Sequence, residues 1–232
     1  MASLYLQYRP QRVKDLDLKT VREFFERILL SGKVNHAYLF TGPKGGGKTS
    51  AARILAKIVN CTKNEAVMLG KRKKFEEPCN KCVACKSIAS GSMVDLIEID
   101  AASNRGIDDI RDLREKIRLA PVAAARKVYI IDEVHMLTLE AFNALLKTLE
   151  EPPLHAVFIL ATTEAHKVPE TIVSRCVRVV FPKASREEIR RSLDRVVKGE
   201  KLKVASDALD MLSFWPKKRL GQLWQKLIVW KT

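Results

Sequence analysis

The chain has 232 residues, and with 47% of them hydrophobic it can bury the core of one large globular domain or of one and a half ordinary ones. Lysine and arginine outnumber aspartate and glutamate by 42 to 27, and the net charge of +15 favours a polyanionic partner, either nucleic acid or an anionic membrane surface. No stretch reaches the roughly eighteen unbroken apolar residues of a membrane helix, and the first ten residues do not resemble a signal peptide, so we expect a cytoplasmic protein with reduced thiols.

Short apolar runs alternate with longer helical patterns along the chain. The short runs are rich in β-branched and aromatic residues, which predicts buried strands at His36 to Thr41, Val94 to Asp100, Lys127 to Asp132, His155 to Thr162 and Val177 to Phe181. Helical periodicity predicts helices at Thr20 to Leu30, Lys48 to Asn60, Ile107 to Leu119, Thr138 to Glu150 and Ser185 to Val197. This order predicts an α/β fold with a doubly wound, parallel, five-stranded sheet.

Changes in composition divide the chain into parts. We expect an α/β domain at 1–181 with a surface insertion at 61–85, where a run of four basic residues precedes three closely spaced cysteines. Pro182 precedes a further helical pattern, so 182–212 is expected to begin a small helical domain. Residues 213–232 form a basic tail that contains all three tryptophans of the chain.

Residues Gly42 to Thr49 read GPKGGGKT and fit the phosphate-loop pattern G-x-x-x-x-G-K-[ST]. The pattern lies directly after a predicted strand and opens a predicted helix, which is the context that it requires; a flexible glycine-rich turn is the alternative. Glycine is needed because backbone N–H groups must turn toward the phosphate oxygens, and a Cβ would block their approach. Lys48 supplies a positive charge and Thr49 a hydroxyl for Mg²⁺. The predicted nucleotide-binding residues are Gly42, Pro43, Lys44, Gly45, Gly46, Gly47, Lys48, Thr49 and Ser50.

Two carboxylates follow another predicted strand. Asp132 and Glu133 end the run VYIIDE, and ligands of parallel sheets gather at the carboxyl ends of the strands. Asp132 is placed to hold Mg²⁺ through water, and Glu133 to polarise the water that attacks the γ-phosphorus. The alternative is an ordinary helix cap with an acidic first turn.

Four cysteines have metal-ligand spacing. Cys79, Cys82 and Cys85 form C-x-x-C-x-x-C, and Cys61 lies upstream, so four thiolates are available for a tetrahedral site. Zinc is the expected metal, since nothing in the sequence indicates redox chemistry. The alternative is three surface thiols and a buried Cys61. Cys176 is expected to be a core residue.

Several motifs together resemble the ATPase part of the gamma/tau subunits of bacterial DNA polymerase III, the AAA+ motors of the clamp loader. The resemblance runs from about Tyr8 to Leu212, and its motifs are YRPQ, HAYLFTGPKGGGKTSAARILAK, EIDAASNRGIDDIR, KVYIIDEVHML, ALLKTLEEPP, FILATTE and SRC. It implies the AAA+ fold, ATP and Mg²⁺ as cofactors, a zinc module on the four cysteines, and other clamp-loader subunits, the sliding clamp and primed DNA as partners, with no membrane role.

The resemblance also implies roles for single residues. Lys48 and Thr49 would bind phosphate and Mg²⁺, and Asp132 and Glu133 would be the Walker B pair. Thr163 would be the sensor 1 residue, with Thr162 as the alternative. Arg175 would be an arginine finger acting on ATP held by a neighbouring subunit; without the resemblance it reads as a surface charge.

Contact with DNA is a weaker expectation. Arg111, Arg114 and Arg118 share one face of a predicted helix, with Arg105 nearby, and could follow a phosphate backbone. A solvated face with the ion pair Arg111–Glu115 explains them equally well.

The resemblance has limits. DLDLK at Asp15 to Lys19 replaces the usual segment after YRPQ, and the likeness ends at Leu212, before the expected sensor 2 segment and collar domain, as in a truncated subunit. Two alternatives stay open: another AAA+ motor such as a Holliday junction helicase, and a scaffold that binds nucleotide without hydrolysing it.

Overall fold

The computed structural model describes residues 7–104, 106–202, 204, 207 and 209–210. The basic tail at 213–232 and the last residues of the predicted helical domain therefore lie outside the described part. Five strands form one parallel sheet in the order β2-β3-β4-β1-β5. They are β1 (Ala37–Thr41), β2 (Leu96–Asp100), β3 (Lys127–Asp132), β4 (Ala156–Thr162) and β5 (Val177–Val180).

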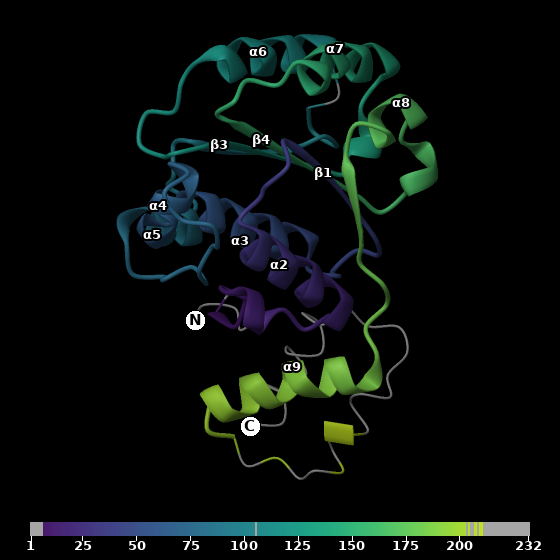
Figure 1. The fold of residues 1–232 in the computed structure, drawn as a ribbon. Coiled ribbons are helices and arrows are strands. Elements are labelled where there is room, and N and C mark those ends of the chain that lie inside the picture. The colour runs from purple at the N-terminus through teal and green to yellow at the C-terminus, as the bar shows by residue number, and fades with distance from the viewer. Residues whose placement is uncertain (1–6, 105, 203, 205–206, 208, 211–232) are drawn as a thin grey trace.

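The helices cover both faces of the sheet (Figure 1). The α-helices are α2 (Lys19–Ser31), α3 (Lys48–Asn60), α4 (Glu65–Met68), α5 (Val83–Ser90), α6 (Ile107–Arg118), α7 (Leu139–Glu150), α8 (Glu170–Val173) and α9 (Arg186–Gly199). Short 3₁₀ turns lie at η1 (Val13–Asp15), η2 (Thr62–Asn64), η3 (Val134–Met136) and η4 (Ala165–Lys167). The predicted doubly wound α/β fold is confirmed.

Alternation along the strands builds two hydrophobic layers. Tyr38 and Phe40 of β1 pack with α2 and α3, whereas Leu39 between them packs with α6, α7 and α8. This follows because successive side chains of a strand point to opposite faces of the sheet. Both faces are covered, so β1, β4 and most of β3 are buried, as their continuous apolar runs predicted.

Local signals explain where the helices begin and end. The Thr138 side chain accepts a hydrogen bond from the Ala141 N–H and caps α7. Ser185 and Glu188 form a reciprocal capping box at the start of α9. Gly32, in a left-handed conformation, ends α2.

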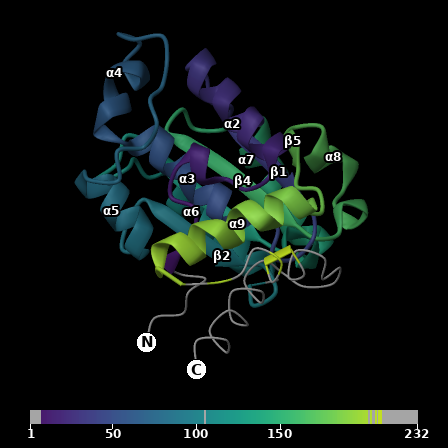
Figure 2. The ribbon, with the colours of Figure 1, turned by 90° about the horizontal axis from the view of Figure 1, so that it is seen from below.

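Helix α9 lies apart from the sheet and contacts the N-terminal segment. It runs below α2 in Figure 1 and crosses in front of the sheet in Figure 2. Arg195 of α9 donates to both carboxylate oxygens of Asp17 at 2.9 and 2.8 Å. Burial raises the pKa of Asp17, and Arg195 opposes this shift. The departure from the family pattern at Asp15 to Lys19 thus supplies an anchor for α9.

No described helix is both long enough and apolar enough to cross a membrane. The division of the chain at Pro182 stays a prediction. In its favour, Leu193, Val196 and Leu209 form a small cluster separate from the two layers of the sheet.

Candidate functional site

The carboxyl ends of three neighbouring strands bring the predicted nucleotide residues together. β1 ends at Thr41 beside Thr162 at the end of β4, and β4 pairs in turn with β3, which ends at Asp132. The phosphate loop continues β1, Glu133 follows β3, and Thr163 follows β4. All three segments therefore emerge at the same edge of the sheet.

The phosphate loop requires glycine at two positions for different reasons. Gly42 has φ +152°, and a Cβ there would lie 2.2 Å from the carbonyl oxygen of Phe181, so only glycine leaves room for the backbone. Gly47 has φ +89°, and a Cβ added there would meet nothing within 4 Å; its left-handed conformation makes it the N-cap of α3. Pro43, Lys44 and Gly45 form the exposed tip of the loop.

Lys48 is buried against the backbone of the phosphate loop. Only 6% of it is exposed, and its Nζ donates to the carbonyl oxygens of Gly42 at 2.8 Å and Pro43 at 3.1 Å. Burial lowers the pKa of Lys48, and the charges of Glu133 and Asp132 oppose this shift. The ammonium group thus lies close to both acidic residues, at the beginning of a helix where anions bind favourably.

Thr49 and Asp132 fit the coordination of a magnesium ion. The Thr49 hydroxyl donates to Oδ2 of Asp132 at 3.0 Å, although 83 residues separate them. Hydroxyl and carboxylate oxygens are the hard ligands that Mg²⁺ prefers, and here they lie next to the phosphate loop.

Glu133 is held in an uncommon backbone conformation. Its φ of +48° and ψ of +43° are left-handed, and its N–H donates to Oδ1 of Asp132 at 3.0 Å. Such conformations in residues other than glycine are costly and concentrate at functional sites. The Glu133 side chain is fixed from the other side, because the Thr163 hydroxyl donates to its Oε2 at 2.9 Å.

The two threonines at the end of β4 have different partners. Thr163 contacts Glu133, whereas the fully buried Thr162 lies 3.0 Å from Nδ1 of His135. Nε2 of His135 lies 3.3 Å from Oε1 of Glu164. His135 was not among the predicted site residues; its position three residues after Asp132, in the turn that carries Glu133, was the available signal.

Arg175 contacts its own chain in this structure. Its guanidinium lies 2.5 Å from Oε1 of Glu150 at the end of α7 and donates to the Thr171 carbonyl oxygen at 2.6 Å. It is partly exposed. Cys176 next to it packs against the second hydrophobic layer, as predicted, and burial raises its pKa to about 12.

The arginines considered for DNA contact are only partly described. Arg105 and the side chains of Arg111 and Arg114 lie outside the described part, while Arg118 is exposed. Contact with phosphates and the ion pair of Arg111 with Glu115 stay predictions.

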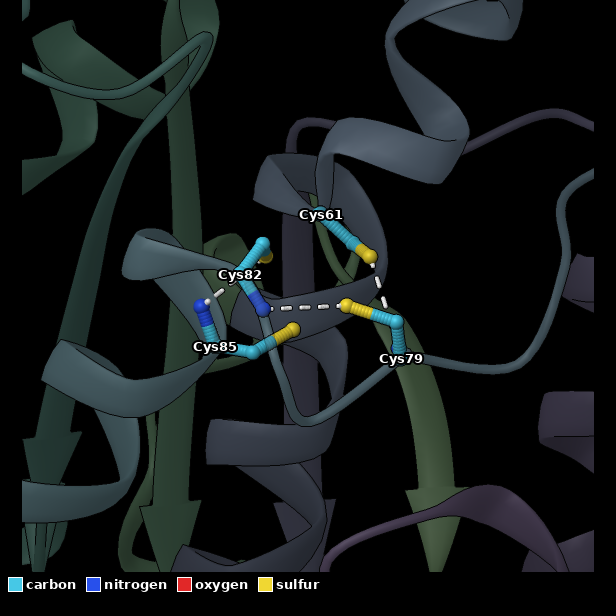
Figure 3. A group of neighbouring side chains, drawn as sticks. All are labelled: Cys61, Cys79, Cys82 and Cys85. Carbon is cyan, nitrogen blue, oxygen red and sulfur yellow. Dashed lines mark hydrogen bonds between the residues drawn. The ribbon is translucent and has the colours of Figure 1, made fainter.

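The four predicted cysteine ligands converge on one point (Figure 3). Their sulfur atoms all lie within 4.8 Å of one another, and a regular tetrahedron with Zn–S bonds of about 2.3 Å needs sulfur atoms about 3.8 Å apart. Cys61 caps the end of α3, Cys79 lies in the loop between α4 and α5, Cys82 caps α5, and Cys85 lies in its first turn. The insertion at 61–85 contains η2, α4 and the beginning of α5, which continues to Ser90.

Backbone N–H groups surround these sulfur atoms. The Cys79 N–H donates to Sγ of Cys61 at 3.4 Å, the Cys82 N–H to Sγ of Cys79 at 3.3 Å, and the Cys85 N–H to Sγ of Cys82 at 3.4 Å. Burial acts to raise the pKa of Cys82, but N–H donors from Thr62 and Cys85 bring it down to about 6. Burial raises the pKa of Cys85. The cluster suits a metal that binds thiolates.

Comparison with known proteins agrees with these features. A family model described as "DNA polymerase III, delta subunit" matches residues 18–185. The DNA polymerase III subunit tau of Bacillus subtilis is 51% identical over 91% of this chain, and that of Escherichia coli is 43% identical over 89%. The chain spans 36% and 31% of the length of these two relatives.

Solved structures support the fold. The Thermotoga maritima RuvB Holliday junction branch migration motor matches 97% of this chain, with 68% of that structure covered, at a TM-score of 0.65 and 18% identity. At this identity the likeness concerns the fold alone. The chain belongs to the DNA polymerase III subunit family described by the matching model, and its curated relatives there are tau and gamma/tau subunits.

Proposed function

We propose that this chain is an ATP-binding and ATP-hydrolysing motor subunit of the DNA polymerase III clamp loader. The observation that carries the proposal is the convergence of Lys48, Thr49, Asp132, Glu133 and Thr163 at one edge of the sheet, with Thr49 and Asp132 joined at 3.0 Å and Glu133 and Thr163 at 2.9 Å. The family membership and the AAA+ fold support the same conclusion.

Each residue has a distinct part in this proposal. The N–H groups of the loop from Gly42 to Ser50 bind the phosphates, and Lys48 exchanges its two carbonyl partners for phosphate oxygens. Thr49 and Asp132 hold Mg²⁺, which supplies neutralising charge to the phosphates when bound. Glu133 orients and polarises the attacking water.

Thr163 positions Glu133 and responds to the presence of the γ-phosphate. Its hydroxyl is already bound to the carboxylate, so a change at the γ-phosphate that moves Glu133 also reaches the end of β4. Thr162 is the weaker candidate for this role because it is buried against His135.

Arg175 acts on a neighbouring subunit in this proposal. An arginine supplied from outside can accelerate phosphoryl transfer by about 10³ to 10⁵. Arg175 is partly exposed, and its pairing with Glu150 is a surface ion pair worth about 1 kcal/mol or less, so it can be exchanged for a phosphate partner on assembly. Other clamp-loader subunits, the sliding clamp and primed DNA are the proposed partners, and Zn²⁺ is the proposed metal of the cysteine cluster.

Nucleotide retention tests the proposal directly. We expect Lys48→Ala to weaken binding of labelled ATP with Mg²⁺ by about 10- to 100-fold, because a hydrogen-bonding charge is lost. Lys44→Ala is the matched control, since Lys44 lies exposed in the same loop. Equal retention by the wild type and Lys48→Ala would contradict the assignment of the site.

Turnover in the assembly separates a motor from a scaffold. The measurement is ATP hydrolysis by the chain together with its partner subunits, with and without primed DNA and clamp. The proposal expects stimulated hydrolysis that Arg175→Ala removes. Nucleotide binding without turnover in the complete assembly would identify a scaffold instead.

A further inference from the structure

Lys57 is a buried cation in the last turns of α3. Only 1% of it is exposed, and its Nζ donates to the amide oxygens of Gln11 at 2.5 Å and Asn80 at 2.9 Å. Lysine is almost never fully buried without a partner of opposite charge, because removing an ammonium group from water costs several kcal/mol. Two neutral amide oxygens satisfy its hydrogen bonds but not its charge.

The cysteine cluster lies beside this cation. Within the part of the chain that the structure describes, no carboxylate forms a salt bridge with Lys57. Burial lowers the pKa of Lys57 and nearby Arg53 adds to this shift, whereas Cys85, Asp15 and Cys82 oppose it. Lys57 and Cys61 lie one turn apart on the same helix, so their side chains project to the same side.

A nearby cation stabilises a tetrathiolate site. Four thiolates around Zn²⁺ carry a net charge of −2, and a charge buried in protein is stabilised chiefly by a nearby charge of opposite sign. The insertion supplies lysines in number, but Lys81 and Lys86, which flank the ligands in sequence, are exposed to solvent.

We propose that Lys57 is the counter-charge of the metal centre and raises the affinity of the four cysteines for Zn²⁺. The inference rests on the zinc centre proposed above and adds a residue that does not touch the metal. Lys57 is thus a positioning residue whose charge stabilises the tetrathiolate.

Through Asn80, Lys57 also contacts the loop that carries the cysteine ligands. Asn80 lies between Cys79 and Cys82 and has a left-handed φ of +56°, which a hydrogen bond from Lys57 holds in place. Burial raises the pKa of Cys85, and a hydrogen bond from the backbone N–H of Asn80 opposes this rise. Lys57 therefore fixes the residue that directs an N–H group at a metal-binding sulfur.

The contact with Gln11 extends this support to the N-terminal segment. Glu77, two residues before Cys79, accepts the N–H groups of Val13 at 2.9 Å and Lys14 at 3.0 Å. The segment that carries Gln11 is thus attached both to Lys57 and to the stretch of chain that leads into the cysteine motif.

Zinc affinity tests the proposal, measured by competition with a chromophoric chelator on the purified full chain. Lys57→Gln removes the charge and keeps an N–H donor, and Lys57→Met removes both. We expect both variants to bind Zn²⁺ about 10- to 100-fold more weakly, the usual effect of losing a group that supports metal ligands. Lys86→Met, an exposed lysine beside Cys85, is the control and should keep wild-type affinity.

The outcomes separate this inference from the metal centre itself. Wild type that binds no Zn²⁺ overturns both, whereas equal affinity of the wild type and Lys57→Gln overturns only the role of Lys57. An equal loss in Lys86→Met would show a general effect of net charge and would also overturn it. Circular dichroism and the absorption of the Co²⁺-substituted protein show whether each variant is folded with tetrahedral thiolate ligation.

Discussion

One helix, α3, connects two sites that are built in different ways. Its first residues, Lys48 and Thr49, belong to the phosphate loop, and its C-cap, Cys61, belongs to the cysteine cluster. The distance between the two ends is about 20 Å, at a rise of about 1.5 Å per residue. The nucleotide site is assembled from three strand ends, whereas the cysteine site depends on a loop and two helix ends.

The two sites obtain their stability from different parts of the fold. Thr49, Asp132, Glu133 and Thr163 are already joined by hydrogen bonds, because the sheet beneath them fixes their backbones. The cysteine loop has weaker support: among the described residues, N–H to sulfur contacts of 3.3 to 3.4 Å surround its ligands, and the Lys57–Asn80 hydrogen bond holds the loop. We therefore expect the sheet to hold the first site and the metal to hold the second.

Metal removal is the largest expected effect. A structural zinc supplies about 10 to 16 kcal/mol of apparent binding free energy, so Cys79→Ser with Cys82→Ser should abolish protection of amides in 61–85. Hydrogen exchange should show little change at β1, β3 and β4. Cys176→Ser, which lies outside the cluster, serves as the control. Loss of protection throughout the sheet would show that the two regions fold as one unit.

Replacing Glu133 is expected to affect chemistry and not assembly of the site. Glu133→Gln should lower ATP turnover by about 10² to 10⁴, the usual contribution of a general base, and leave ATP binding unchanged. Glu140→Gln, an exposed residue of α7, is the matched control. Near-normal turnover in Glu133→Gln would show that another residue acts as the general base.

The two threonines at the end of β4 should differ when each hydroxyl is removed. Thr163→Val loses a hydrogen bond to a carboxylate, worth about 1.5 to 3 kcal/mol, and turnover should fall by about 10- to 100-fold. Thr162→Val should instead lower the free energy of unfolding, because it leaves His135 without this partner. Steady-state kinetics and urea denaturation measure the two effects. The reverse pattern would assign the sensor role to Thr162.

Two glycines offer the smallest and most closely matched test. Gly47 and Gly70 both have positive φ, +89° and +72°, and neither has an atom within 4 Å of an added Cβ, so alanine adds only backbone strain of about 1 to 2 kcal/mol. Gly47→Ala should lower the midpoint temperature of the main unfolding transition. Gly70→Ala should lower only the protection of amides in the insertion at 61–85 from hydrogen exchange. The same loss of global stability in both would contradict the separation of the two regions.

The positions of the strands along the chain were predictable because buried parallel strands give short, continuous apolar runs. Every observed strand falls within a predicted run, and β2 begins two residues later than predicted, at Leu96, because Val94 is exposed. Helix α3 agrees at both ends, where the phosphate loop and Cys61 mark the boundaries. The beginning of α5 inside the insertion was missed, since a short helix capped by a cysteine lacks the usual signals.

Much of the candidate site was also predictable, but its internal contacts were not. Spacing and context predicted a phosphate loop, two carboxylates and four cysteines as site residues, and the structure brings the members of each group together. No periodicity could show that Lys57 is buried against Asn80, that Arg9 donates to Ser50 at 2.8 Å, or that Arg195 pairs with Asp17. These contacts join segments far apart in the chain, so they depend on the finished fold.

The absence of space at Gly42 has a mechanical consequence. The Phe181 N–H donates to the Thr41 carbonyl oxygen at 2.7 Å, and its own carbonyl leaves no room for even one methyl group at the neighbouring glycine. Phe181 is also the point where the chain leaves β5 on its way to α9. A displacement of the loop backbone toward β5 would therefore move Phe181 and, through it, the segment that leads into α9.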